Sequence, residues 1–297
     1  MASRYTMREP NHGGYAPPAP FGLYENGLIP HEILRLLVGT VNLFDKDNER
    51  LVKVTENELR NGRILKPEPN RVLNKIFEGG VTEDDYVRVL REIGARNRRY
   101  FEKLRGELIH CLAAKKEGFH LESFLHLYRC VELISTLMPM LYARSQDNFQ
   151  DTKSFFMDLM KDEKEGELKV LERFISHISR STQINDVVFV FDLSNLPTRY
   201  LEVTKDQIAR KVLSALKDDQ YEIDDTSETV TVKFLAMSKY IVSLRNRIFH
   251  YSASRSNIDI SEIGGASHVA RISTKEGIYW FSIIYAQILV KLISTKI

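Results

Sequence analysis

A stretch near the C-terminal end of the chain, residues 245–251, gathers more chemically useful side chains than any other. It reads Arg-Asn-Arg-Ile-Phe-His-Tyr and closes an apolar-periodic segment that predicts a helix over residues 229–250. A polar segment, residues 252–257, follows at once. Two guanidinium groups, a side-chain amide and an imidazole are therefore expected to lie together where a helix ends.

These side-chain types suit the cleavage of a phosphodiester. The guanidinium group of Arg245 can stabilise negative charge on phosphate oxygens through forked hydrogen bonds. The imidazole of His250 titrates near neutrality and can exchange a proton with the attacking or departing oxygen, while Asn246 can hold the imidazole or the phosphate. In RNA the 2′-hydroxyl group supplies the nucleophile, so this chemistry needs no metal ion or other cofactor. DNA lacks that group, so RNA is the predicted substrate.

Helix geometry limits how the arginine and the histidine of this stretch can meet. At about 100° per residue, Arg245 and His250 lie about 140° apart around a straight helix. They converge only if the helix distorts near its end or if the site draws on two copies of the chain. Arg105 and His110 have the same spacing in the middle of a predicted helix, and we interpret that match as accidental.

The same stretch also has a structural interpretation and several candidate neighbours. Asn246 and His250 share a helix face, so they can form a polar pair that ties the helix end to the following segment. Arg247 and Tyr251 are possible supporting residues of the site. Glu132, on an earlier predicted helix, is another candidate for a supporting role, and an ion pair with Arg129 three residues before it is the structural alternative.

Most of the segments that must position this stretch are predicted to be helical. Residues 82–116 and 121–142 keep a helical spacing on either side of Gly118, so they are expected to lie antiparallel as the start of a bundle. Pro139 is expected to kink the second helix or end it early. Residues 274–293 are apolar around most of the helix, which predicts burial in the bundle core or at a subunit interface.

Little of the sequence suggests β-structure. Residues 187–191 read Val-Val-Phe-Val-Phe but lack an obvious partner strand, so they are interpreted as a buried extended segment or part of a helix. Residues 31–44 have helical spacing. Residues 1–30 are rich in proline and glycine and are expected to form an irregular arm.

Composition and charge exclude several classes of protein. The 297 residues include 42 Lys and Arg against 40 Asp and Glu, a formal net charge of +2, so a surface wholly devoted to nucleic acid is not expected. Cys111 and Cys130 lie in apolar helical patterns without metal-ligand spacing, which predicts buried thiols and no metal site. No apolar secretory segment opens the chain. A cytoplasmic protein that does not enter a membrane is therefore expected.

One group of basic residues offers a second place for RNA to bind. Arg91, Arg98 and Arg105 are seven residues apart and form a stripe on the helix predicted over residues 82–116. This stripe is either a ridge for a phosphate backbone or a solvated face that is partly paired with acidic side chains.

Residues 244–251 resemble the signature of the HEPN superfamily, the higher eukaryotes and prokaryotes nucleotide-binding domain. That signature has an arginine, a polar residue that is often asparagine, three or more further residues and a histidine at a helix end. The resemblance implies a helical, usually dimeric fold, with Arg245 and His250 as the catalytic pair and Asn246 beside the arginine. It also implies a composite active site across the dimer interface, as in many metal-independent endoribonucleases of toxin–antitoxin and antiviral-defence systems.

The predicted fold class is therefore all-α, a HEPN-like helical bundle with additions. Residues 1–30 form the arm, 31–81 an N-terminal helical extension, and 82–297 the bundle, with an insertion at about 145–226. The first functional hypothesis is a homodimeric endoribonuclease of a toxin or antiviral-defence system, with an antitoxin or another component of that system as a possible partner. The second is a non-catalytic helical module that binds a protein or nucleotide partner in such a system.

Overall fold

The chain folds around one long C-terminal helix, with helices and two small sheets packed against it. This computed structural model describes residues 4–10, 17, 21–23, 28–60, 81–145, 148–159, 167–180, 183–194, 196, 198–249, 257–258 and 265–295. Helices make up most of this part, but it also contains two three-stranded antiparallel sheets. The prediction of an all-α fold is therefore wrong.

The elements follow one another in a mixed order along the chain. The described helices are α1 (Ile29–Leu37), α3 (Glu83–Arg96), α4 (Arg98–Glu117), α5 (His120–Ser145), α6 (Phe149–Leu159), α7 (Glu167–Ser179), α8 (Thr198–Asp206), α9 (Met237–Phe249) and α10 (Gly265–Ser294). The described strands are β1 (Tyr5–Arg8), β2 (Val41–Asp45), β3 (Arg50–Val54), β4 (Val188–Asp192), β5 (Tyr221–Asp224) and β6 (Thr229–Lys233).

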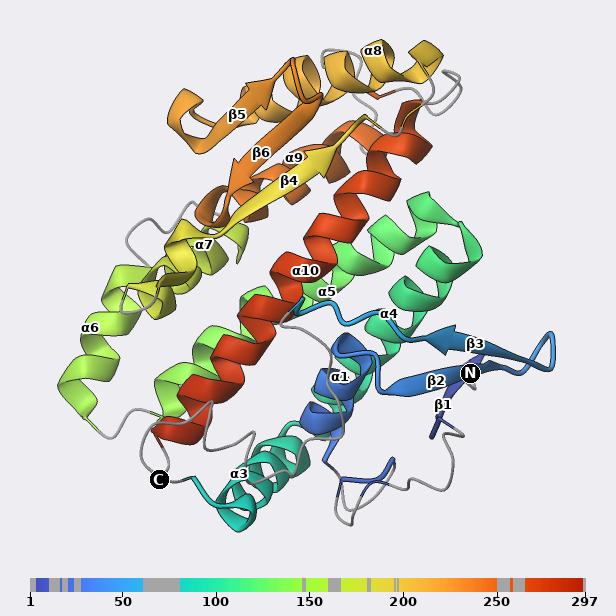
Figure 1. The fold of residues 1–297 in the computed structure, drawn as a ribbon. Coiled ribbons are helices and arrows are strands. Elements are labelled where there is room, and N and C mark those ends of the chain that lie inside the picture. The colour runs from blue at the N-terminus through green and yellow to red at the C-terminus, as the bar shows by residue number, and fades with distance from the viewer. Residues whose placement is uncertain are drawn as a thin grey trace.

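Helix α10 runs through the middle of the molecule between the two sheets (Figure 1). Most of its apolar side chains are buried, including Ile278, Trp280, Phe281 and Ile284, and Tyr279, Ile283 and Val290 are partly buried against the core. The rest of this chain covers most of the apolar circumference of α10, so the burial of this helix does not by itself require a second subunit. By length and composition, α10 is also the one described helix that is able to cross a membrane. Of its most apolar 18-residue stretch, 61% is buried inside the molecule.

Helices α4 and α5 pack side by side and against the core, as their spacing in the sequence predicts. Gly118 ends α4 with a left-handed backbone (φ 81°), a conformation that glycine adopts without a steric penalty. Two expectations for these helices are wrong. The helix predicted over 82–116 breaks at Asn97, whose side-chain amide donates to the carbonyl of Ile93 (3.0 Å). Helix α5 continues past Pro139 to Ser145, so the expectation that Pro139 ends this helix early is wrong.

The first sheet has the order β1-β2-β3 and includes part of the predicted irregular arm. Strand β1 pairs antiparallel with β2 and buries Tyr5 and Met7. The helix predicted over 31–44 ends early because Gly39 turns the chain with φ 70°, where a Cβ atom would lie 2.6 Å from the carbonyl oxygen of Glu56. The chain after this turn forms β2, in which Val41, Asn42, Leu43 and Asp45 are buried and Phe44 is partly buried.

The second sheet has the order β4-β6-β5 and contains the stretch 187–191 that we interpreted as lacking a partner. Its partner is β6, at residues 229–233, which we had assigned to a helix. Only residues 237–249 of that predicted helix form α9. Phe189 and Phe191 contact Tyr279 of α10 and Tyr240 of α9, with ring centroids 5.4 Å and 4.8 Å apart.

Two strands of this second sheet lie on either side of residue 226, where the predicted insertion was expected to end. Strands β5 and β6 pair across that position, with Ile223 opposite Val230. The residues that we expected to be inserted therefore share a sheet with β6, which a 3-10 turn (Phe234–Ala236) joins to α9.

Candidate functional site

Helix α9 brings the predicted catalytic stretch to the surface at its last turn. One face of α9 is buried, through residues that include Met237, Tyr240, Ile241, Leu244 and Ile248. Arg245, Asn246 and Arg247 are partly exposed near the end of the helix. His250 and Tyr251 lie outside the described residues. The meeting of Arg245 with His250 therefore stays a prediction.

The guanidinium group of Arg245 is held by two neighbours that carry no charge. Its Cζ atom lies 4.7 Å from the centroid of the Tyr128 ring, on α5. Its Nη1 atom donates a hydrogen bond to Oδ1 of Asn246 (3.1 Å). A cation over a tyrosine ring is attracted by the negative face of the π-system. Tyr128 is only 4% exposed, so the surrounding side chains restrict the movement of this ring.

Three other arginines with buried or partly buried side chains are paired with acids. Arg35 binds Glu9 (2.6 Å), Arg60 binds Glu276 (2.8 Å), and Arg105 binds the buried Glu32. Within the described residues, no carboxylate pairs with Arg245. Among the described residues, no acidic side chain therefore compensates its positive charge, and the guanidinium group is oriented and able to attract an anion.

Ile258 lies beside the last turn of α9 and binds it through a backbone hydrogen bond. The backbone N–H of Ile258 donates to the carbonyl of Arg247 (2.9 Å), and Nζ of Lys211 donates to the carbonyl of Asn257 (2.8 Å). Lys211 belongs to a π-helical segment, Gln207–Val212, in the predicted insertion. The predicted insertion therefore contacts Asn257, which precedes the residue that binds the last turn of α9.

The sequence did not predict that Lys211 lies close to Asn257. Residue 211 is 36 positions before Arg247, and no motif joins the two. A lysine near the end of an amphipathic helix is common, so the sequence held no usable signal for this contact.

Glu132 lies one helical turn beyond Tyr128 on the same side of α5. Its carboxylate makes no ion pair with Arg245 or Arg129 in the described part of the chain. Arg129 instead lies 3.7 Å from Glu107 of α4, so the expected Arg129–Glu132 pair is wrong. Glu132 remains a neighbour of the Arg245 support, and a direct role stays a prediction.

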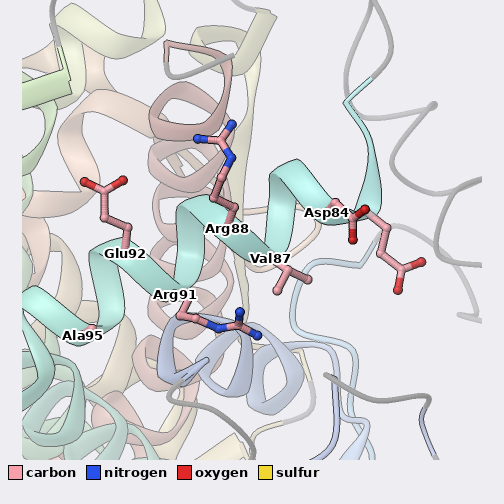
Figure 2. Close-up of a pocket in the computed structure, with 7 residues that line it drawn as sticks. Asp84, Val87, Arg88, Arg91, Glu92 and Ala95 are labelled. Carbon is pink, nitrogen blue, oxygen red and sulfur yellow. The ribbon is translucent and has the colours of Figure 1, made fainter.

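The basic stripe at Arg91, Arg98 and Arg105 is divided between two helices by the break at Asn97. Arg98 binds Glu102 (2.8 Å), and Arg105 binds Glu32 with only 19% of its side chain exposed. Arg91 lies on the exposed side of α3, beside Arg88 and Glu92 (Figure 2). A phosphate backbone would have to displace acids from two of the three arginines.

The second arginine–histidine match, Arg105 and His110, also has separate partners. His110 stacks on His126 of α5, with ring centroids 5.1 Å apart, while Arg105 binds Glu32. Nothing in the described part brings these two side chains together, which agrees with an accidental match of spacing.

Two surface pockets in the described part of the chain are lined by elements other than α9. One, of about 730 Å³, runs along α3 and is lined by Glu83, Asp84, Val87, Arg88, Arg91, Glu92 and Ala95 (Figure 2). The other, of about 270 Å³, lies between α6 and α7. No residue of α9 lines either one.

The described residues contain no group of three or more His, Cys, Asp or Glu side chains that is able to hold a metal ion. Cys111 and Cys130 are free and buried, and burial raises the pKa of the Cys111 thiol to about 12. Neither thiol is therefore available as a reactive thiolate near neutral pH.

Comparisons with known proteins add no family to this description. No protein-family model matches the sequence, and no curated protein or solved structure matches it. The HEPN resemblance therefore depends on residues 244–251 alone.

Proposed function

We propose that the protein is a metal-independent endoribonuclease of a toxin or antiviral-defence system, and that it acts as a homodimer. The observation that supports this most is the state of Arg245. Its guanidinium group is oriented by the Tyr128 ring and the Asn246 amide, is partly exposed, and has no carboxylate partner among the described residues. An arginine in this state suits a phosphate oxygen that gains charge during a reaction.

The proposed reaction is attack by the RNA 2′-oxygen on the adjacent phosphorus. A bond forms between the 2′-oxygen and phosphorus, and the bond from phosphorus to the 5′-oxygen breaks. One base takes the proton of the 2′-hydroxyl, and one acid gives a proton to the departing 5′-oxygen. The products are a 2′,3′-cyclic phosphate and a 5′-hydroxyl end. Arg245 stabilises the extra charge on the phosphate oxygens, and His250 serves as the proton carrier.

A homodimer provides this reaction with two imidazoles and two guanidinium groups. One imidazole can then accept the proton of the nucleophile while the other protonates the leaving oxygen. The angle of about 140° between positions 245 and 250 on a straight helix also favours groups from different copies. The partners of this proposal are therefore an RNA substrate, a second copy of the chain and a restraining or activating protein.

The test is incubation of the purified protein with RNA in excess EDTA. We expect cleavage that yields 5′-hydroxyl ends, which accept a phosphate from a kinase without prior phosphatase treatment. An RNA of the same sequence with 2′-deoxyribose throughout should stay intact. Arg245→Ala and His250→Ala should each lower the rate by a hundredfold or more, since each is asked to supply about 3 kcal/mol.

Matched controls separate the site from general damage to the protein. Arg96→Ala removes an exposed arginine that pairs with Glu92 (2.9 Å), and His120→Ala removes a histidine at the start of α5. Both variants should cleave RNA at the wild-type rate. No cleavage by the wild-type protein, or equal cleavage by His250→Ala, contradicts the proposal.

A second candidate function is a non-catalytic module that binds a protein or nucleotide partner in a defence system. The hydrogen bond between Arg245 and Asn246 favours it, because this pair is satisfied inside one chain and can stabilise the helix end without any reaction. In this case Arg245→Ala retains partner binding and full biological activity, whereas an endoribonuclease loses that activity.

A further inference from the structure

We propose that Tyr128 is the positioning residue for Arg245, acting through the face of its ring. This inference depends on the proposed function for its activity readout and on the geometry for the rest. The guanidinium carbon of Arg245 lies 4.7 Å from the ring centroid, within the distance over which a cation and an aromatic face attract each other.

The Tyr128 ring is fixed by the packing of α5 in the core. The neighbouring residues Leu127, Cys130 and Val131 are fully buried, and Tyr128 itself is 4% exposed. Next to it along α5, the side chain of Leu127 faces Gly277 of α10, where the absence of a side chain lets the two helices approach closely. The ring is therefore a rigid platform, and Arg245 reaches it from a helix that is itself anchored by the second sheet.

The Tyr128 ring accounts for how Arg245 is held without an acidic partner among the residues that the structure describes. An acid at this place would hold Arg245 well but would also compete with a phosphate for its positive charge. A ring face and an amide oxygen orient the guanidinium group and leave the charge largely uncompensated. Arg60 shows the contrast, because its guanidinium group lies over the Tyr279 ring (4.1 Å) and also binds Glu276.

The experiment compares Tyr128→Phe, which keeps the ring face, with Tyr128→Leu, which removes it at similar bulk. Tyr128→Phe should cleave RNA within about twofold of the wild-type rate, and Tyr128→Leu should lower kcat by about tenfold to thirtyfold with little change in KM. Tyr142→Leu is the control, since it makes the same change farther along α5, where Tyr142 packs on Phe155. It should leave kcat unchanged.

A second readout does not need RNA cleavage. Phenylglyoxal modifies exposed arginines, and peptide mass spectrometry reports the rate at Arg245. Tyr128→Leu should raise that rate several-fold, and Tyr128→Phe should not. If the wild-type protein does not cleave RNA, the proposed function fails while this measurement still decides the role of Tyr128.

Two results would overturn the inference. Equal loss of activity in Tyr128→Phe and Tyr128→Leu would assign the effect to the hydroxyl group rather than to the ring face. Wild-type kcat and wild-type reactivity of Arg245 in Tyr128→Leu would show that the ring does not position the arginine.

Discussion

At the scale of single residues, the guanidinium group of Arg245 has two properties that a lysine lacks. It is planar, so it can lie flat on the Tyr128 ring, and it presents several N–H donors in a fixed fork. We therefore expect Arg245→Lys to lose on the order of a hundredfold in kcat/KM for RNA, although it keeps the charge. Steady-state kinetics on a short RNA substrate measure this loss.

The control for this change is Arg129→Lys, one residue beyond Tyr128 on α5. Arg129 is 48% exposed and lies 3.7 Å from Glu107, a contact that a lysine can replace. Its kcat/KM should stay within about threefold of the wild-type value, since exposed ion pairs contribute little. If Arg245→Lys is as active as this control, only the charge of residue 245 matters.

His31 links stability to pH through its neutral ring. Burial, and next the charge of Arg35, lower the pKa of His31 to about 4, and the ring hydrogen-bonds the hydroxyl of Tyr86 (3.0 Å). The unfolded chain binds a proton at His31 below about pH 6.5, whereas the folded chain does so only near pH 4. Stability should therefore fall as the pH drops from about 6.5 to 4, by at most about 3 kcal/mol from this group.

Urea unfolding at pH 6.5 and pH 4.5 measures this dependence. In His31→Gln the difference in unfolding free energy between the two pH values should shrink by about 1–3 kcal/mol. An unchanged difference would assign the pH dependence to other groups.

Residue types near the site were predictable where local spacing carried the information. The sequence predicted that Arg245 and Asn246 lie together at a helix end, because neighbours on one helix are set by the helical period. It did not predict that Arg245 covers Tyr128 or that Lys211 reaches the carbonyl of Asn257. Those contacts join elements far apart in the chain, and only the packing of whole helices brings them together.

At the scale of elements, Gly277 sets how closely α10, α5 and α9 approach. A Cβ atom at this position would lie 2.6 Å from Cδ2 of Leu127 and 3.6 Å from Cδ1 of Ile241. Leu127 is fully buried and has little room to move, so Gly277→Ala should destabilise the fold by about 1–2 kcal/mol after the higher helix propensity of alanine offsets part of the clash. Thermal unfolding should show a melting temperature lower by several degrees.

Gly106→Ala is the matched control, because Gly106 also lies inside a helix. No atom lies within 4 Å of a Cβ placed there, so only the higher helix propensity of alanine remains. This variant should be stabilised by about 0.5–1 kcal/mol. The two substitutions are therefore expected to change the melting temperature in opposite directions, and a shift of the same sign in both would contradict the role of Gly277.

Helices were more predictable than strands for a physical reason. A helix shows its period within one segment, and α4, α5 and α10 follow their apolar spacing. A strand needs a partner, and β4 pairs with β6 about forty residues later in the chain. Local periodicity therefore missed this sheet, and with it the extended start of the segment that leads into α9.

At the scale of the whole molecule, the N-terminal part closes over α10 through polar contacts. The hydroxyl of Tyr285 donates to the carbonyl of Pro30 (2.8 Å), and the hydroxyl of Ser282 donates to the carbonyl of Glu58 (3.0 Å). The guanidinium group of Arg60 binds both carboxylate oxygens of Glu276 (2.8 and 2.9 Å). Pro30, Glu58 and Arg60 are thus tied to the central helix by contacts that no local pattern indicates.

Removing the ion pair between Arg60 and Glu276 tests how much the contact between the N-terminal part and α10 contributes to the free energy of unfolding. The side chain of Glu276 is 5% exposed and that of Arg60 is 37% exposed. Arg60→Met leaves a buried carboxylate without its partner, which should destabilise the protein by about 2–3 kcal/mol. Removing both charges in Arg60→Met/Glu276→Met should recover at least half of that loss, because no buried charge is then left unpaired. Urea unfolding of the two single variants and the double variant gives this coupling, and additive losses would show that the pair does not hold the N-terminal part on α10.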